Sequence, residues 1–128
     1  MEALAAVRLK PKKVLVVDDE RDVREIIAEM IADLGYEVHG VSSGEAALNL
    51  IDESSVDLLI SDVKMEGMDG LALVKRVRQK FPELPLALMT SYANDDVHRM
   101  LSDRIVDFLL PKPFNMNELQ GMVQSLAG

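Results

Sequence analysis

The sequence contains no cysteine and carries no excess of positive charge. Without cysteine there is no disulfide framework, no thiolate zinc site and no thiol catalysis. Its 14 Lys and Arg residues stand against 22 Asp and Glu, a net charge of -8. This argues against direct binding of nucleic acid or of an anionic membrane, because both require clustered positive charge. The apolar runs are far shorter than the roughly 20 residues of a membrane span, and Arg8 interrupts the apolar start before a signal-peptide core. We therefore expect a soluble, cytoplasmic protein.

The chain does contain enough apolar material for a folded core. Of its 128 residues, 48% are hydrophobic and 28% are charged, which is typical of a globular domain. The length fits one domain and leaves no room for a second. We expect residues 1–11 to be a weakly structured lead-in, and residues 12–128 to form the domain.

From residue 14 onward, short apolar runs alternate with longer segments whose apolar residues recur every three or four positions. The predicted strands are 14–17, 36–41, 57–61, 85–89 and 106–110. The predicted helices are 23–34, 44–52, 71–81, 94–103 and 115–126. Capping boxes are expected at residues 42–45 and at Asn115 with Glu118, and the last helix is expected to bury Met116. Strict alternation predicts a parallel sheet with helices on both faces, a doubly wound α/β domain.

Polar residues follow four of these predicted strands, where the carboxyl ends of a parallel sheet form one functional edge. They are Asp18, Asp19, Asp62, Thr90 and Lys112. Taken singly, each has an ordinary explanation as a helix cap, a strand former or a solvated cation. Taken together, the three carboxylates would repel one another unless a hard divalent cation such as Mg2+ joined them. Asp62 could then attack a phosphoryl group, while Thr90 and Lys112 hold its remaining oxygens.

These residues belong to four motifs in the order Val14 to Glu20, Asp62 to Gly70, Met89 to Ser91 and Pro111 to Phe114. Together the motifs resemble the receiver domains of two-component response regulators, over residues 12–126. The resemblance implies a single doubly wound (βα)5 flavodoxin-like domain with a parallel five-stranded sheet of order 2-1-3-4-5. It also implies Mg2+-dependent acceptance of a phosphoryl group from a sensor histidine kinase or phosphotransfer protein. Such a domain is no enzyme beyond its own phosphorylation and dephosphorylation.

The resemblance further implies roles for the acidic residues. Asp62 is the expected phospho-acceptor. Asp19, Asp62 and the backbone carbonyl of Lys64 are the expected Mg2+ ligands, and Asp18 assists, often through a water molecule.

Thr90 is the expected switch hydroxyl and Lys112 the expected phosphate-binding lysine, with a cis bond before Pro113. Phosphorylation is expected to draw Thr90 inward and to alter partner binding on the face formed by residues 94–103, 106–110 and 115–126. A homodimer through that face is left open, as are the cognate kinase and the downstream effector. No effector segment follows Gly128, so we expect either a stand-alone regulator or a receiver from a longer protein.

Two positions depart from the family pattern. Glu66 stands where a proline is usual and adds a negative charge beside the site. The family usually has an aromatic residue three positions before the lysine. Here that position is Leu109, and Phe108 lies one residue earlier. Because a shift of one residue reverses the face to which a strand side chain points, either a bulge restores Phe108 as the aromatic switch or that switch is absent.

Lys64 and Tyr92 are candidates for tuning the lifetime of the phosphoryl group, although both also suit ordinary surface positions.

Three other functions share parts of this pattern. A haloacid-dehalogenase-type phosphohydrolase also uses Mg2+ and an aspartate nucleophile, but it needs an Asp-x-Asp motif on the first strand, where this chain has Asp18 and Asp19. A flavodoxin-type FMN binder needs a Ser- and Gly-rich phosphate loop at that place. A phosphorylation-independent interaction module is disfavoured because every site residue is present.

Overall fold

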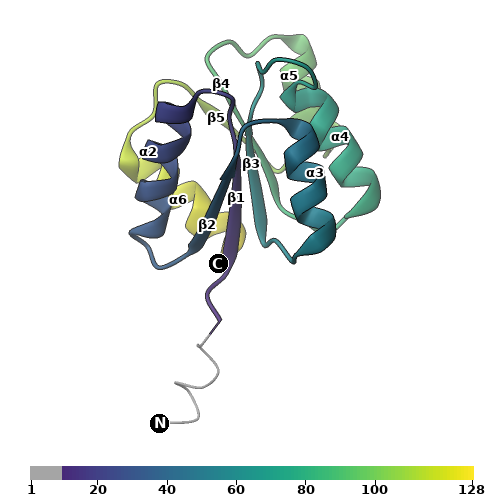
Figure 1. The fold of residues 1–128 in the computed structure, drawn as a ribbon. Coiled ribbons are helices and arrows are strands. Elements are labelled where there is room, and N and C mark those ends of the chain that lie inside the picture. Colours follow the sequence, from purple (N-terminus) through teal and green to yellow (C-terminus); the bar gives the residue numbers. More distant parts are fainter. Residues whose placement is uncertain (1–9) are drawn as a thin grey trace.

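The computed structural model describes residues 10–128 and has an α/β architecture (Figure 1). The strands are β1 (Lys13–Val17), β2 (Glu37–Val41), β3 (Leu58–Asp62), β4 (Leu86–Thr90) and β5 (Phe108–Pro111). The helices are α2 (Arg21–Ala32), α3 (Gly44–Glu53), α4 (Gly70–Lys80), α5 (Asp95–Ser102) and α6 (Met116–Ala127). The strands pair in parallel in the order β2-β1-β3-β4-β5, so the predicted fold is confirmed.

The lead-in expected at residues 1–11 falls mostly on residues 1–9, which lie outside the described part of the chain. Between residues 10 and 128, no helix has both the length and the apolar character needed to cross a bilayer.

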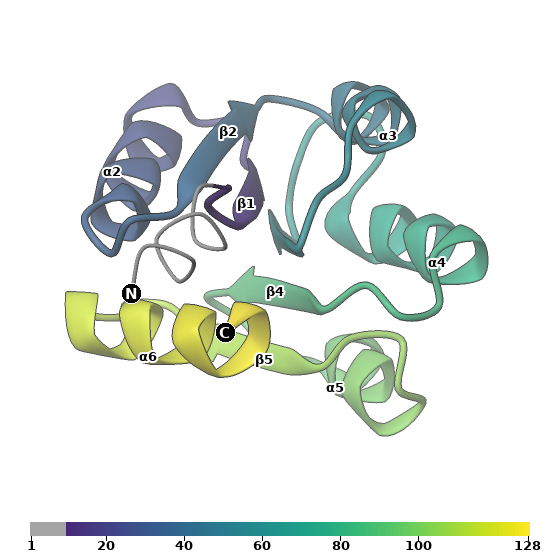
Figure 2. The same cartoon turned by 90° about the horizontal axis from the view of Figure 1, so that it is seen from below.

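The sheet separates two apolar cores. Successive residues of a strand point to opposite faces. Val14 and Val16 therefore belong to the core that includes residues of α2 and α6, whereas Leu15 and Val17 belong to the core that includes residues of α3, α4 and α5. Figure 2 shows α2 and α6 on one side of the sheet and α3, α4 and α5 on the other. Because β1, β3 and β4 are covered on both faces, the loops at their carboxyl ends start from rigid positions.

The helix starts agree only in part with the sequence. Asn115 and Glu118 form the predicted capping box of α6. The capping box predicted at residues 42–45 is wrong. Ser43 is the cap of α3, and its hydroxyl accepts from the backbone N–H of Ala46. The methyl side chain of Ala46 has no acceptor with which to complete a box. Met116 is 45% exposed rather than buried, because it lies in the first turn of α6, ahead of the residues that face the core.

Strand β5 pairs with β4 in one unbroken register, from Ala87 opposite Phe108 to Thr90 opposite Pro111. This ladder has no bulge. Phe108 lines a groove against α6 and is 39% exposed, whereas Leu109 packs against the core beneath α5. The register therefore lacks the bulge that would carry Phe108 to the aromatic position of the family, and a role of Phe108 in switching stays a prediction.

Candidate functional site

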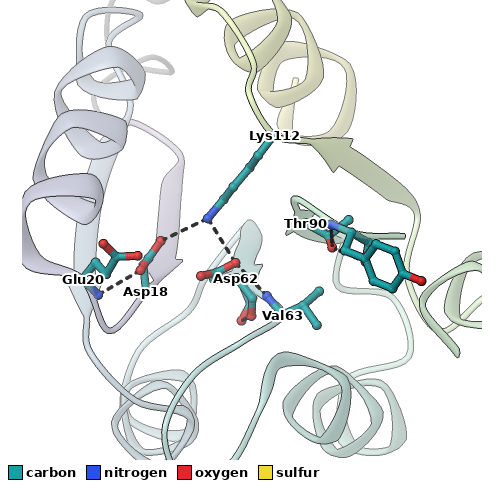
Figure 3. Close-up of polar contacts among 8 residues, drawn as sticks. Asp18, Glu20, Asp62, Val63, Thr90 and Lys112 are labelled. Atoms are coloured by element: carbon teal, nitrogen blue, oxygen red, sulfur yellow. Dashed lines mark hydrogen bonds and ion pairs between the residues drawn. The ribbon is translucent and has the colours of Figure 1, made fainter. Parts of the chain in front are cut away.

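The carboxyl edge of the sheet gathers an acidic cluster and one lysine (Figure 3). Asp18 follows β1 and Asp62 is the last residue of β3. One carboxylate oxygen from each of Asp18, Asp19 and Asp62 lies within 4.8 Å of the others. Lys112, directly after β5, extends its Nζ toward Asp18 and Asp62 (Figure 3). The parallel topology thus brings these predicted residues together.

Asp18 is fully buried and only half satisfied. Its Oδ1 accepts from the backbone N–H of Glu20 at 2.9 Å. Its Oδ2 accepts no hydrogen bond from the described part of the chain and lies 4.0 Å from Nζ of Lys112. Burial raises the pKa of Asp18 above its ordinary value of 3.8, and the charge of Asp62 adds to this; the Glu20 bond and Lys112 act in the opposite direction. A buried oxygen without a partner, beside two further carboxylates, is a chemical fit for a hard divalent cation.

Asp62 is held by donors on one side. Its Oδ1 accepts from the backbone N–H of Val63 at 3.0 Å and from Nζ of Lys112 at 3.2 Å. Within residues 10–128, no hydrogen bond reaches its Oδ2. The residue is 8% exposed. A carboxylate with one oxygen held by donors and the other without one is suited to act as a nucleophile.

Gly70 shapes the loop behind Asp62. Its backbone N–H donates to the carbonyl of Val63 at 2.8 Å, and a Cβ at this position would overlap the carbonyl oxygen of Asp62. The loop therefore returns directly onto the end of β3. Only glycine permits this approach without displacing the backbone of Asp62.

Asp19 is exposed and bonds to the same loop. Its Oδ2 accepts from the backbone N–H of Glu66 at 3.1 Å. A proline at that position would have no N–H to donate. The departure at Glu66 therefore supplies a hydrogen bond between the two acidic loops. Lys64, in the same loop, has an exposed side chain, and the metal role of its carbonyl stays a prediction.

The hydroxyl of Thr90 is turned toward its own loop. It donates to the carbonyl of Tyr92 at 2.9 Å and accepts from the N–H of Tyr92 at 3.1 Å. No hydrogen bond among the described residues joins it to Asp62, and Figure 3 places Thr90 apart from the lysine and the acidic cluster. The side chain of Tyr92 is 71% exposed. The bond between Lys112 and Pro113 is cis, as predicted.

The sequence did not reveal three groups that hold the site in place. Two are backbone N–H groups: that of Glu20 donates to the carboxylate of Asp18, and that of Val63 donates to the carboxylate of Asp62. The third is Arg24, whose Nη1 donates to the carbonyl of Asp18 at 2.7 Å. No sequence signal marks any of them, because backbone donors carry no residue identity and an arginine on a surface helix usually reaches solvent.

A five-stranded parallel sheet with this strand order and an acidic carboxyl edge defines the CheY-like class of flavodoxin-like domains. The family model of the response regulator receiver domain matches residues 14–124. The chain belongs to the response regulator receiver domain family.

Known proteins of this family resemble the chain in sequence and in structure. The response regulator protein FleR of Pseudomonas aeruginosa is 39% identical over 112 residues, which are 87% of this chain and 24% of FleR. The chain thus spans about a quarter of the length of this relative. The chemotaxis protein CheY4 of Vibrio cholerae has a TM-score of 0.85 at 30% identity, with 91% of this chain and 98% of that chain covered. The response regulator TrrA of Thermotoga maritima, solved in complex with Mg2+-BeF, has a TM-score of 0.80 at 35% identity, with 90% and 98% covered.

Proposed function

We propose that Asp62 accepts a phosphoryl group from a phosphohistidine of a sensor histidine kinase or a phosphotransfer protein. A carboxylate oxygen of Asp62 attacks phosphorus, the phosphorus–nitrogen bond breaks, and the electron pair returns to the imidazole. The observation that carries the proposal is the position of Asp62, beside Nζ of Lys112 at 3.2 Å and within the acidic cluster. Lys112 is placed to hold an oxygen of the incoming phosphoryl group.

The same cluster would hold the Mg2+ ion that the reaction requires. We assign its ligands to the carboxylates of Asp19 and Asp62 and to the carbonyl of Lys64, with Asp18 assisting, directly or through water. When bound, the cation neutralises the clustered negative charge and the charge of the phosphoryl oxygens. The unpartnered Oδ2 of Asp18 and the TrrA complex with Mg2+-BeF support this assignment.

Thr90 would act as the switch. In the structure its hydroxyl is engaged by Tyr92, so reaching the phosphoryl group requires two hydrogen bonds to break. Each is worth about 1 kcal/mol net, which charge-assisted bonds to the phosphoryl oxygens can replace. The loop after β4 leads directly into α5, so its rearrangement would change the face formed by α5, β5 and α6.

The output of this switch is a change in partner affinity rather than turnover of an external substrate. The face of α5, β5 and α6 would contact a downstream domain or protein, or a second copy of the chain. The cytoplasm is the proposed location, because the proposed phosphodonor kinases act there. Lys64 and Tyr92 would tune phosphoryl lifetime by restricting the approach of water, although both side chains are exposed in the structure.

The phosphohydrolase alternative is weaker at one position. Its general acid would stand two residues after the nucleophile, where this chain has Lys64 after Asp62. A lysine cannot supply the carboxyl group that this role requires.

Intact mass spectrometry after incubation with acetyl phosphate tests the proposal. The wild type should gain one phosphoryl group with Mg2+ and none with excess chelator. Asp62→Asn should gain none, whereas the control Asp52→Asn, an exposed aspartate paired with Lys80, should behave as wild type. Equal labelling of Asp62→Asn and wild type would refute the assignment. If the wild type gains nothing, Mg2+ titration followed by a stable phosphoryl mimic distinguishes rapid hydrolysis from a domain that no longer switches.

A further inference from the structure

Arg24, on α2, is connected to the acidic site through the main chain. Its Nη1 donates to the carbonyl oxygen of Asp18 at 2.7 Å, in a partly buried position. This carbonyl belongs to the segment between β1 and α2, which also carries Asp19. The guanidinium therefore contacts the backbone that presents two of the carboxylates.

A glycine on the neighbouring strand makes room for this arginine. A Cβ at Gly40, in β2, would lie 3.0 Å from Cγ of Arg24 and 3.1 Å from its Cδ. The aliphatic part of Arg24 thus lies directly against the backbone of Gly40. Gly40 is paired with Val16 in β1, so the arginine lies against the residue of β2 that is opposite the position two before Asp18.

Within residues 10–128, one polar atom of Asp18 is left without a hydrogen-bond partner. Its backbone N–H donates to the carbonyl of Val41 at 3.1 Å, its carbonyl accepts from Arg24, and its Oδ1 accepts from Glu20. The remaining atom is Oδ2, to which none of these residues donates. Arg24 therefore contacts the main chain of the residue whose Oδ2 is left without a donor.

We propose that Arg24 is a positioning residue for the cation site, with Gly40 as the surface on which it lies. The proposal rests on the proposed Mg2+ function and adds a residue that contacts neither cation nor phosphoryl group. It predicts a sign opposite to simple electrostatics. By electrostatics alone, removing the positive charge of Arg24 would strengthen Mg2+ binding because it removes repulsion between two cations. Loss of positioning would instead weaken it.

The experiment measures Mg2+ affinity by calorimetry, together with stability in denaturant, for the wild type and four variants. Arg24→Ala should bind Mg2+ about tenfold more weakly, the size typical of lost support behind metal ligands. Arg24→Lys should recover part of the affinity because its ammonium can still donate to one carbonyl. Gly40→Ala keeps every charge but displaces the arginine, so it should weaken binding as well. Arg21→Ala, which removes an exposed arginine of the same helix paired with Glu25, is the matched control and should lose no affinity.

Each outcome decides the proposal. Unchanged or tighter Mg2+ binding by folded Arg24→Ala would overturn it, as would equal weakening in Arg21→Ala. A loss of stability without a change in affinity would reduce Arg24 to a packing role. If Arg24→Ala does not fold, Gly40→Ala and Arg24→Lys carry the same comparison. A wild type that binds no Mg2+ would overturn the proposed function together with this inference, and is thereby distinguished from failure of the positioning role alone.

Discussion

Replacing Asp18 by asparagine should stabilise the metal-free protein and weaken its binding of Mg2+. Asp18 is fully buried, and its Oδ2 accepts no hydrogen bond from residues 10–128. Leaving a buried acceptor unsatisfied costs about 1–3 kcal/mol. Asparagine keeps an oxygen for the N–H of Glu20 and places an N–H donor beside Asp62. Since about 1 kcal/mol shifts the unfolding midpoint of a domain of this size by about 4 °C, the midpoint should rise by about 4 °C or more.

The pH dependence of this gain follows from the raised pKa of Asp18. Between the ordinary value of 3.8 and the raised pKa, the folded protein binds more protons at this site than the unfolded chain does. The contribution of Asp18 to stability is therefore greatest at low pH and is lost as the pH rises through this window. Asp18→Asn does not titrate, so its advantage over the wild type should grow from about pH 4 to about pH 7.

Thermal unfolding followed by circular dichroism, with excess chelator and at both pH values, measures this difference. Titrating groups distant from Asp18 are shared by the two proteins, so their effects cancel in the comparison, whereas Asp62 and Lys112 interact with the charge that is removed. Added Mg2+ should raise the midpoint of the wild type more than that of the variant, since a ligand stabilises the state that binds it. A variant that is equal to or less stable than the wild type at about pH 7 without metal would refute the reasoning.

Three further predictions test other parts of the site. Gly70→Ala should lose about 1–3 kcal/mol of unfolding free energy, because its Cβ would overlap the carbonyl of Asp62. The control Gly121→Ala, in open space within α6, should gain about 0.5–1 kcal/mol. Equal effects of the two substitutions in denaturant titrations would contradict the comparison. Phe108→Ala should leave phosphorylation by acetyl phosphate intact, since Phe108 faces α6; a large loss of labelling would show otherwise. Lys64→Ala should change the decay of the phosphorylated mass with little change in Mg2+ affinity, and an unchanged decay would exclude Lys64 from lifetime control.

The carboxyl edge could be predicted because topology alone assembles it. Once strands and helices alternate, the parallel arrangement brings the ends of different strands to one edge, whatever their loops do in detail. The proximity of Asp18, Asp62 and Lys112 could be predicted from their positions at strand ends alone. The cation and phosphoryl chemistry proposed for this edge rests on residue type and stays a prediction.

The details that failed depend on local geometry that residue type does not determine. Two adjacent serines are both good helix caps, and only the backbone decides that Ser43 rather than Ser42 caps α3. A threonine hydroxyl can adopt several rotamers, and the sequence does not say which one Thr90 takes, so its bonds to Tyr92 could not be predicted. The role inferred for Arg24 depends on its contact with Gly40. Such a contact between a helix and an edge strand leaves no pattern in the sequence, so it could not be predicted.

The ion pair between Lys112 and Asp62 joins residues 50 positions apart in the chain. Strands β3 and β5 are not neighbours in the sheet; each pairs with β4 between them. A chain that has not yet docked its last strand therefore lacks the partner of Asp62. If Lys112 holds the phosphoryl group as proposed, labelling at Asp62 should be slower in molecules that have not completed the sheet.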